Sequence, residues 1–321
     1  MKKSLLYCCI VLLATVCVSN QARADKKELV YRLKWLFNAS VAGDIYADAH
    51  GYFDRAGLKV VVKQGGPEKN AIKELELGQA SFGVASADQV IRALDKGAEV
   101  VVLAQIFQTN PMQWIYRAKL PELTDITQLK GKSIGVTFGG NDESIMNTLL
   151  AKGGLTTEDV NIHSARFDFT PFLTGKVEIW PVYRNSQGVI LKSRLQAEGE
   201  NVRFLNPADF GVSFVANSII TSKKMIEKHP ETVDRFLNSL LAAWTDSMNP
   251  TNEDKTLAAI ASRDKGNTEN IIKLQLLATR HLVQAETFGT IDVASWKQTE
   301  EIMLKEKQIR NGVEIEKWLR Y

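Results

Sequence analysis

Cysteine is nearly absent from this sequence, and its three copies lie close to the amino terminus, at Cys8, Cys9 and Cys17. Removal of the leader described below would leave no thiol for a disulfide, a thiolate metal site or a cysteine nucleophile. The four histidines are scattered without metal-ligand spacing, and no H-E-x-x-H motif is present. We therefore expect no metal site and no thiol chemistry.

Motifs of enzymes are also missing. The sequence contains no P-loop and no G-x-G-x-x-G. The letters G-x-S-x-G occur once, at 131–135, but Ser133 there begins an expected strand instead of lying at the strand-to-helix turn that a nucleophilic serine requires. Asp142 and Glu143 are adjacent carboxylates at an expected helix start, where capping and compensation of the helix dipole explain them at least as well as acid–base chemistry. We expect no catalytic residue and no cofactor. An exported enzyme that uses Asp142 or Glu143 with His163 is an alternative.

The chain also lacks a large excess of charge of either sign. The chain has 40 Lys and Arg against 37 Asp and Glu, and its first 24 residues hold Lys2, Lys3 and Arg23 but no acidic residue. Without these three, 37 basic residues face 37 acidic ones. A balanced chain offers no argument for binding nucleic acid or an acidic membrane, so neither is expected as a partner.

The amino terminus has the pattern of a secretion signal. Two lysines precede an apolar run from residue 5 to about 18, and the small residues Ala22 and Ala24 form a cleavage site. The run is too short to span a bilayer. We expect cleavage after about Ala24 and a periplasmic product. Lipid attachment at Cys17 is a minor alternative, because Val16 is a poor residue before a lipidated cysteine.

Strands and helices alternate along the rest of the chain. Apolar strands are expected at 27–37, 58–62, 80–84, 100–104, 133–137, 160–166, 177–182, 202–205 and 214–221. Short connections between such elements indicate a mainly parallel sheet with helices on both faces, whose ligand sites lie at the carboxyl ends of the strands. The segments ELGQASFGVASAD and FLTGKVEIWPVYRNS repeat one arrangement of helix, glycine, strand and polar turn. We therefore expect an α/β fold of two similar lobes.

The segment 130–152, KGKSIGVTFGGNDESIMNTLLAK, predicts a strand, a turn at Gly139 and Gly140, and a helix capped by Asn141 or Asp142. Backbone amides at a helix start can bind an anion or the polar edge of a ligand. Taken alone, an ordinary strand-to-helix connection explains the segment. As the second-lobe half of a repeated arrangement, it is expected to line a crevice between the lobes with residues 138–142.

Aromatic and polar side chains occur in pairs where the expected strands end. The pairs are Trp35 with Asn38, Ser86 with Asp88, Phe138 with Asn141, and Trp180 with Tyr183. Such side chains can stack on a flat ring and read its edges, although core packing explains either tryptophan equally well. Pro181 cannot donate to a sheet and so argues against a continuing central strand, which favours a cleft position for Trp180 and Tyr183. The aromatic residues in 107–116 are expected at a hinge or rim.

Several segments together resemble the NMT1/THI5-like family, the solute-binding proteins of ABC importers for nitrate, sulfonates and the pyrimidine precursor of thiamine. They are LKWLFNASVAGDIYADAHGYFDRAGLKV, ELGQASFGVASADQV, GKSIGVTFGGND, LTGKVEIWPVY and FVANSIITSKKMIEKHPETV. The resemblance runs from about residue 29 to 247. It implies a two-lobed periplasmic binding protein of type II-like form that closes like a hinged clamp on a small molecule. The lobes would comprise 25–116 with 218–321, and 117–217.

The resemblance also implies roles for the paired residues. The motifs L-K-W and W-P-V-Y look most similar to binders of thiamine-type pyrimidines. Trp35 and either Tyr183 or Trp180 would sandwich a heteroaromatic ring. Asn38 and Asp88 would read the edge of that ring. The amides of Gly139, Gly140 and Asn141 would face a polar or anionic substituent. The partner would be an ABC-importer permease, and the protein would act as a monomer.

Two other functions are compatible with the sequence. A sulfonate or oxyanion binder of the same family would use a cation, for which Arg184 is the candidate in the second-lobe motifs. A sensory ectodomain on the same scaffold is a further alternative. Exchange of Trp180 for Ala is expected to cripple a ring binder and to spare an anion binder.

Overall fold

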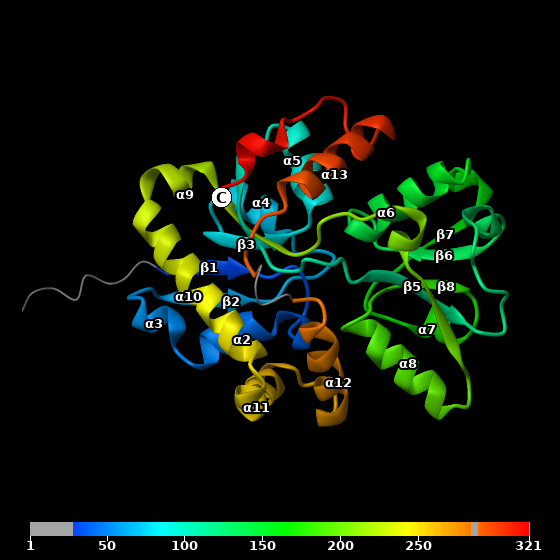
Figure 1. Ribbon diagram of the computed structural model, residues 1–321, viewed down its shortest axis with the longest axis horizontal. Helices are drawn as coiled ribbons and strands as arrows, with labels where there is room; N and C mark the ends of the chain where they lie inside the picture. The colour runs from blue at the N-terminus through cyan, green and yellow to red at the C-terminus, as the bar shows by residue number, and fades with distance from the viewer. Residues whose placement is uncertain (1–27, 284–287, 321) are drawn as a thin grey trace, which may run out of the picture.

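The computed structural model describes residues 28–283 and 288–320. The expected leader, the cleavage site after Ala24 and Cys17 lie outside these residues. Two α/β lobes stand side by side, each with one sheet of five strands (Figure 1). Within the described residues, no helix is both long and apolar enough to cross a lipid bilayer.

The sheet of the first lobe has the strand order β2-β1-β3-β10-β4. Its members are β1 (Leu29–Arg32), β2 (Val60–Lys63), β3 (Phe82–Ala85), β4 (Val100–Gln105) and β10 (Ser218–Ser222). Strand β1 pairs in parallel with β2 and β3, whereas β10 is antiparallel to both β3 and β4. Four strands therefore run in one direction and β10 runs against them.

The sheet of the second lobe has the order β7-β6-β8-β5-β9. Its members are β5 (Met112–Arg117), β6 (Ser133–Val136), β7 (Asn161–Ser164), β8 (Ile179–Tyr183) and β9 (Val202–Leu205). Strand β6 pairs in parallel with β7 and β8, and β5 is antiparallel to β8 and β9. Both sheets are thus mixed, with one reversed strand each, which refines the expected mainly parallel arrangement.

The two reversed strands are those that follow the passages between the lobes. The chain leaves the first sheet after β4 and enters the second with β5, and it returns between β9 and β10. The expected boundary at 116/117 falls inside β5, so the first passage lies earlier, at 106–111. Sequence reading missed β5 as a strand because all six of its residues are buried and no alternation of apolar and polar residues marks it.

Helices cover both faces of each sheet (Figure 1). In the first lobe they are α2 (Ala42–Ala49), α3 (Tyr52–Arg55), α4 (Ala71–Glu76), α5 (Ala87–Asp95), α9 (Lys223–Lys228), α10 (Pro230–Met248), α11 (Glu253–Arg263), α12 (Glu269–Arg280) and α13 (Val293–Lys305). In the second they are α6 (Asn141–Lys152), α7 (Thr170–Leu173) and α8 (Gln187–Ala197). Short 3-10 turns are η1 (Ala39–Val41), η2 (Ile126–Leu129), η3 (Thr157–Asp159), η4 (Pro207–Phe210), η5 (Pro250–Asn252) and η7 (Ile315–Trp318).

The expectation about Pro181 is wrong. Strand β8 continues through Pro181 and is the central strand of its sheet, with Pro181 opposite Trp114 of β5. The paired register with β6 reaches only Ile179, so Pro181 lies beyond that pairing and its missing N–H removes no hydrogen bond there.

Helices α2 and α10 pack closely in the core of the first lobe. A Cβ atom on Gly43 would lie 2.1 Å from the ring of Trp244, so only glycine allows this approach. Next to it, the hydroxyl of Tyr31 donates a hydrogen bond of 2.6 Å to Oδ1 of Asp44. Burial raises the pKa of Asp44 to about 7, although the hydrogen bond from Tyr31 opposes the rise.

Candidate ligand-binding site

A cavity of about 490 Å³ lies between the two lobes. Its wall includes residues that follow β1, β2, β6 and β7, together with residues at the ends of β3 and β8. These are the carboxyl ends of strands from both sheets, where α/β folds bind ligands. The volume suits a small organic molecule rather than a macromolecule.

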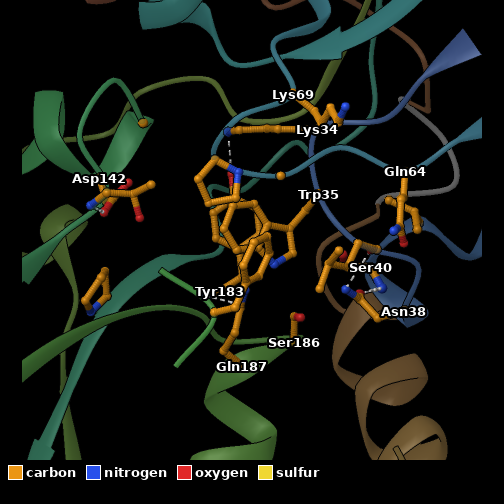
Figure 2. Close-up of a pocket in the computed structure, with 18 of the residues that line it drawn as sticks. Lys34, Trp35, Asn38, Ser40, Gln64, Lys69, Asp142, Tyr183, Ser186 and Gln187 are labelled. Carbon is orange, nitrogen blue, oxygen red and sulfur yellow. Dashed lines mark hydrogen bonds between the residues drawn. The ribbon is translucent and has the colours of Figure 1, made fainter. Parts of the chain in front are cut away.

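Two aromatic side chains line the cavity from opposite lobes. Trp35 follows β1 in the first lobe, and Tyr183 ends β8 in the second. Both side chains are half-buried, so part of each packs against the protein and part stays accessible. In Figure 2 they lie near the centre of the cavity, with Asp142 on one side and Asn38 and Ser40 on the other. This arrangement can hold a flat ring.

Lys34 connects the lobes beside these aromatic residues. Its Nζ atom donates a hydrogen bond of 2.8 Å to the hydroxyl of Tyr183, a residue labelled with Lys34 in Figure 2. It donates a second hydrogen bond, of 3.0 Å, to Oδ1 of Asn141. The ammonium also lies 5.3 Å from the centre of the Tyr183 ring. Sequence analysis missed this residue. The available signal was a lysine placed between two apolar residues, Leu33 and Trp35, in the expected strand 27–37.

The glycine turn before α6 lines the cavity, but its amides have partners of their own. The amide of Gly139 donates to Oε2 of Glu143 at 2.8 Å, and that of Gly140 donates to the carbonyl of Thr137 at 2.8 Å. A Cβ atom on Gly140 would lie 2.4 Å from Oδ1 of Asp142, so the turn requires glycine there. The expected role of the Gly139 and Gly140 amides toward a ligand is therefore not available in this conformation.

Asp142 is a buried carboxylate of the cavity wall. Its Oδ2 accepts a hydrogen bond of 2.5 Å from the amide of Thr137. Burial raises the pKa of Asp142 to about 6, while the bond from Thr137 and the nearby charge of Lys34 oppose the rise. Together with Glu143 it supplies negative charge at the start of α6. The helix dipole is thereby compensated internally, which weakens its attraction for an anionic ligand.

Ser86 and Asp88 lie elsewhere than expected. Both are fully buried and are not among the described residues that line the cavity. The hydroxyl of Ser86 donates a hydrogen bond of 2.6 Å to Oδ1 of Asp88. The hydroxyl of Ser144 on α6 donates one of 2.9 Å to Oδ2 of the same carboxylate. Arg92 in turn donates to Ser144. Ser86 also forms a capping box with Gln89, which holds its side chain at the start of α5. The pair joins α5 and α6 across the lobes.

Asn38 lines the cavity with its polar atoms already engaged. Its Oδ1 accepts from the amide of Ser40 at 2.8 Å, and its Nδ2 donates to the carbonyl of Leu36 at 3.1 Å. The residue caps η1 and shapes the wall. Phe138, in contrast, is 59% exposed while lining the same cavity.

Trp180 reaches the cavity wall but belongs to the core of the second lobe. Its side chain is 1% exposed and lies 6.5 Å from the ring of Phe172. A Cβ atom on Gly135 would lie 2.9 Å from the Trp180 ring. Of the two stacking partners proposed for Trp35, Tyr183 has the more accessible side chain. The described residues that line the cavity and were missed by sequence analysis include Lys34, Gln64, Gln89, Phe167, Gln187 and Asn217.

The residues considered for anion binding or catalysis do not assemble at the cavity. Neither Arg184 nor His163 is among the described residues of its wall. In the described ranges, no group of three or more His, Cys, Asp or Glu could hold a metal ion. The cations of the wall are instead Lys34, Lys69, Arg166, Arg263 and Lys265.

Comparisons with known proteins agree with this architecture. A family model described as NMT1/THI5 like matches residues 38–253. A putative thiamine biosynthesis protein of Haemophilus influenzae is 23% identical over 201 residues, which cover 62% of this chain and 62% of that protein. The chain therefore spans less than two thirds of that relative. A formylaminopyrimidine-binding protein of Halalkalibacterium halodurans is 22% identical over 299 residues, covering 90% of this chain and 88% of the relative.

Solved structures share the fold. The alkanesulfonate-binding protein SsuA from Xanthomonas axonopodis pv. citri, bound to MOPS, superposes with a TM-score of 0.71 at 17% sequence identity. The superposition covers 92% of this chain and 99% of that one. The likeness confirms the predicted fold of two α/β lobes with a cleft between them.

Proposed function

Because the chain belongs to the NMT1/THI5-like family, we propose that it is a solute-binding protein that captures a small heteroaromatic compound between its lobes and delivers it to an ABC importer. The ligand we propose is a pyrimidine precursor of thiamine. One observation carries the proposal: Trp35 and Tyr183 line one cavity from opposite lobes. The name of the Halalkalibacterium halodurans relative, a formylaminopyrimidine-binding protein, supports the same ligand class.

The charges of the cavity favour a ring over an anion. Lys34 is already hydrogen-bonded to Tyr183 and Asn141. Arg166 is paired with Glu68, and Arg263 with Asp48. Two of the wall's cations pair with carboxylates outside it, and Lys34 holds the lobes together. An oxyanion that bound Lys34, Arg166 or Arg263 would therefore have to displace existing partners.

A sulfonate binder is the second candidate, because the fold is shared with an alkanesulfonate-binding protein. In such a binder, Lys69 and Lys265 of the wall would take the anion in place of Arg184. An exported enzyme has support of the same kind, because the fold is also shared with the desulfurization enzyme DSZB, with a TM-score of 0.58 at 14% sequence identity. However, the described residues of the cavity wall do not bring together a set of side chains for catalysis. A sensory ectodomain has no such neighbour among the structures named above.

The proposal includes a location and a partner. A binding protein of an ABC importer works outside the cytoplasmic membrane, so we place the mature protein in the periplasm, as a monomer that contacts a permease in its closed form. Closure around the ligand would shift the protein from open to closed states. No nucleic acid and no cofactor is part of this function.

Ligand identity can be tested directly. Mass spectrometry of the compound that copurifies with the protein should give the unmodified mass of a pyrimidine. A thermal-shift panel of formylaminopyrimidine, related aminopyrimidines, alkanesulfonates and nitrate should raise the melting temperature for the pyrimidines by about 5 °C at a ligand concentration near 100 Kd. A shift with sulfonates alone would move the assignment to the second candidate. A chemically altered product would support an enzyme instead.

A further inference from the structure

Two loops meet at the edge of the cavity that lies farthest from the passages between the lobes. They are residues 64–70, which follow β2, and residues 165–169, which follow β7. Strands β2 and β7 are the outer strands of their sheets, on the opposite side from β4 and β10 in the first lobe and from β5 and β9 in the second. We call these two loops the rim.

The rim is held by contacts between the lobes. The ring of Phe167 lies 5.4 Å from the ring of Trp35, at an angle of 39°. Nη1 of Arg166 lies 3.2 Å from Oε1 of Glu68. Gly66 has φ +149°, and a Cβ atom added to it would lie 3.0 Å from Cζ of Phe167. The backbone of the first loop thus comes into close contact with the aromatic ring of the second.

Phe167 is unusual in combining this contact with exposure. Its side chain is 53% exposed although it lines the cavity. A large apolar side chain gains little stability from such a position in the folded lobe alone. Its partners, Trp35 and Gly66, both belong to the other lobe. The contacts of Phe167 with them therefore exist only while the lobes are together.

We propose that Phe167 and the pair Arg166–Glu68 form a clasp that closes the rim and sets the rate at which ligand leaves. The proposal rests on the proposed function, since it takes the cavity as a ligand site. When two lobes rotate apart about a hinge, the points farthest from the hinge move most. Contacts at the rim break early in opening, so they stabilise the closed form and oppose release of the ligand without having to touch it.

The size of the effect follows from the contacts. An aromatic pair changes an equilibrium by about two- to tenfold, and an exposed ion pair by about one- to fivefold. Because the clasp stabilises the closed form, removing it is expected to raise the dissociation rate of the ligand more than it changes the association rate. Trp35 provides a fluorescent reporter at the clasp itself.

The first experiment measures ligand release by stopped-flow fluorescence, with the pyrimidine that gives the largest thermal shift. Phe167→Ala should raise the dissociation rate by about two- to tenfold. Leu304→Ala, which shortens an exposed apolar side chain on α13, is the control and should leave the rate unchanged. Glu68→Arg and Arg166→Glu should each raise the rate, and the double variant should restore it. Equal rates for Phe167→Ala and the original protein would overturn the clasp.

The second experiment needs no ligand and separates the two proposals. Spin labels on Lys73→Cys and Lys176→Cys, two exposed positions in the first and second lobe, report the distance between the lobes. All three native cysteines lie in the expected leader, so the mature chain carries no competing thiol. Phe167→Ala should shift the distances toward longer values. If no compound binds, the proposed function fails, but these distances still test the clasp. Distances that are the same in Phe167→Ala and in the original protein would exclude the clasp.

Discussion

Nζ of Lys34 in the first lobe donates a hydrogen bond of 2.8 Å to the hydroxyl of Tyr183 in the second. The same ammonium donates to Oδ1 of Asn141, so one side chain ties the segment after β1 to both β8 and the start of α6. These bonds span the cleft and can form only when the lobes are closed. The tie is thus a property of the closed conformation rather than of either lobe.

Lys34→Met should weaken ligand binding by about tenfold or more, because hydrogen bonds to a charged donor contribute about 1.5–3 kcal/mol. The measurement is isothermal titration calorimetry with the pyrimidine ligand. Lys69→Met, which removes an exposed lysine from the same cavity wall, is the matched control and should change affinity much less. An unchanged affinity for Lys34→Met would show that the tie does not contribute to closure.

Trp35 and Trp180 should respond differently to replacement by alanine. Trp35→Ala should reduce affinity by about tenfold or more while the fold is retained, because a half-exposed stacking surface is lost. Trp180→Ala should lower the free energy of unfolding by about 3–5 kcal/mol, because its ring is fully buried. Denaturant unfolding and calorimetry on both variants check this. A Trp180→Ala protein that is as stable as the original but unable to bind would contradict the assignment.

Gly43→Ala should destabilise the first lobe by about 1–3 kcal/mol or more, since the new methyl group would overlap the ring of Trp244. Gly266→Ala is the control, because a Cβ atom there would have its nearest neighbour at 3.8 Å. The change in denaturant midpoint at constant slope measures the effect. Equal stability of the two variants would mean that α2 and α10 separate at little cost.

Asp44 should make stability depend on pH. Its pKa is raised from 3.8 to about 7 in the folded protein, so the folded state keeps a proton that the unfolded chain releases above pH 3.8. This contribution is present in full below pH 3.8 and is lost as the pH rises through about 7. In that window the free energy of unfolding should fall with pH by at most about 1.4 kcal/mol per unit from this group.

Asp44→Asn keeps an oxygen that can accept from Tyr31 and removes the titration. Its stability should therefore vary less between pH 4 and 7 than that of the original protein. Asp142, whose pKa is raised to about 6, contributes a slope of the same sign to both proteins, so their difference isolates Asp44. Parallel stability curves for the two proteins would rule out a titrating Asp44.

Much of the fold could be predicted because local patterns mark it. The helix of α6 after a glycine turn, and the short strand β3 between Gly78 and Ser86, both appear where the sequence indicates them. The strand β5 could not be found in this way, since its partners β8 and β9 lie far along the chain and its burial on both faces hides any alternation.

The site was harder to predict, for two physical reasons. Trp35 and Trp180 look alike in sequence, and only the packing of their side chains decides which is core. Lys34 finds its partners 107 and 149 residues away, a relation that no local pattern contains. Ser86, by contrast, could have been assigned correctly: a Gln three residues later marks a capping box, which turns the hydroxyl toward its own helix.

The position of β10 has a consequence for the order of folding. It lies between β3 and β4, so the first sheet lacks an inner strand until residues 218–222 have been synthesised. The second sheet is built from residues 112–205 without a break. A chain that emerges from its amino terminus can therefore complete its second lobe first, and the lobe that begins the sequence is the last to close its core.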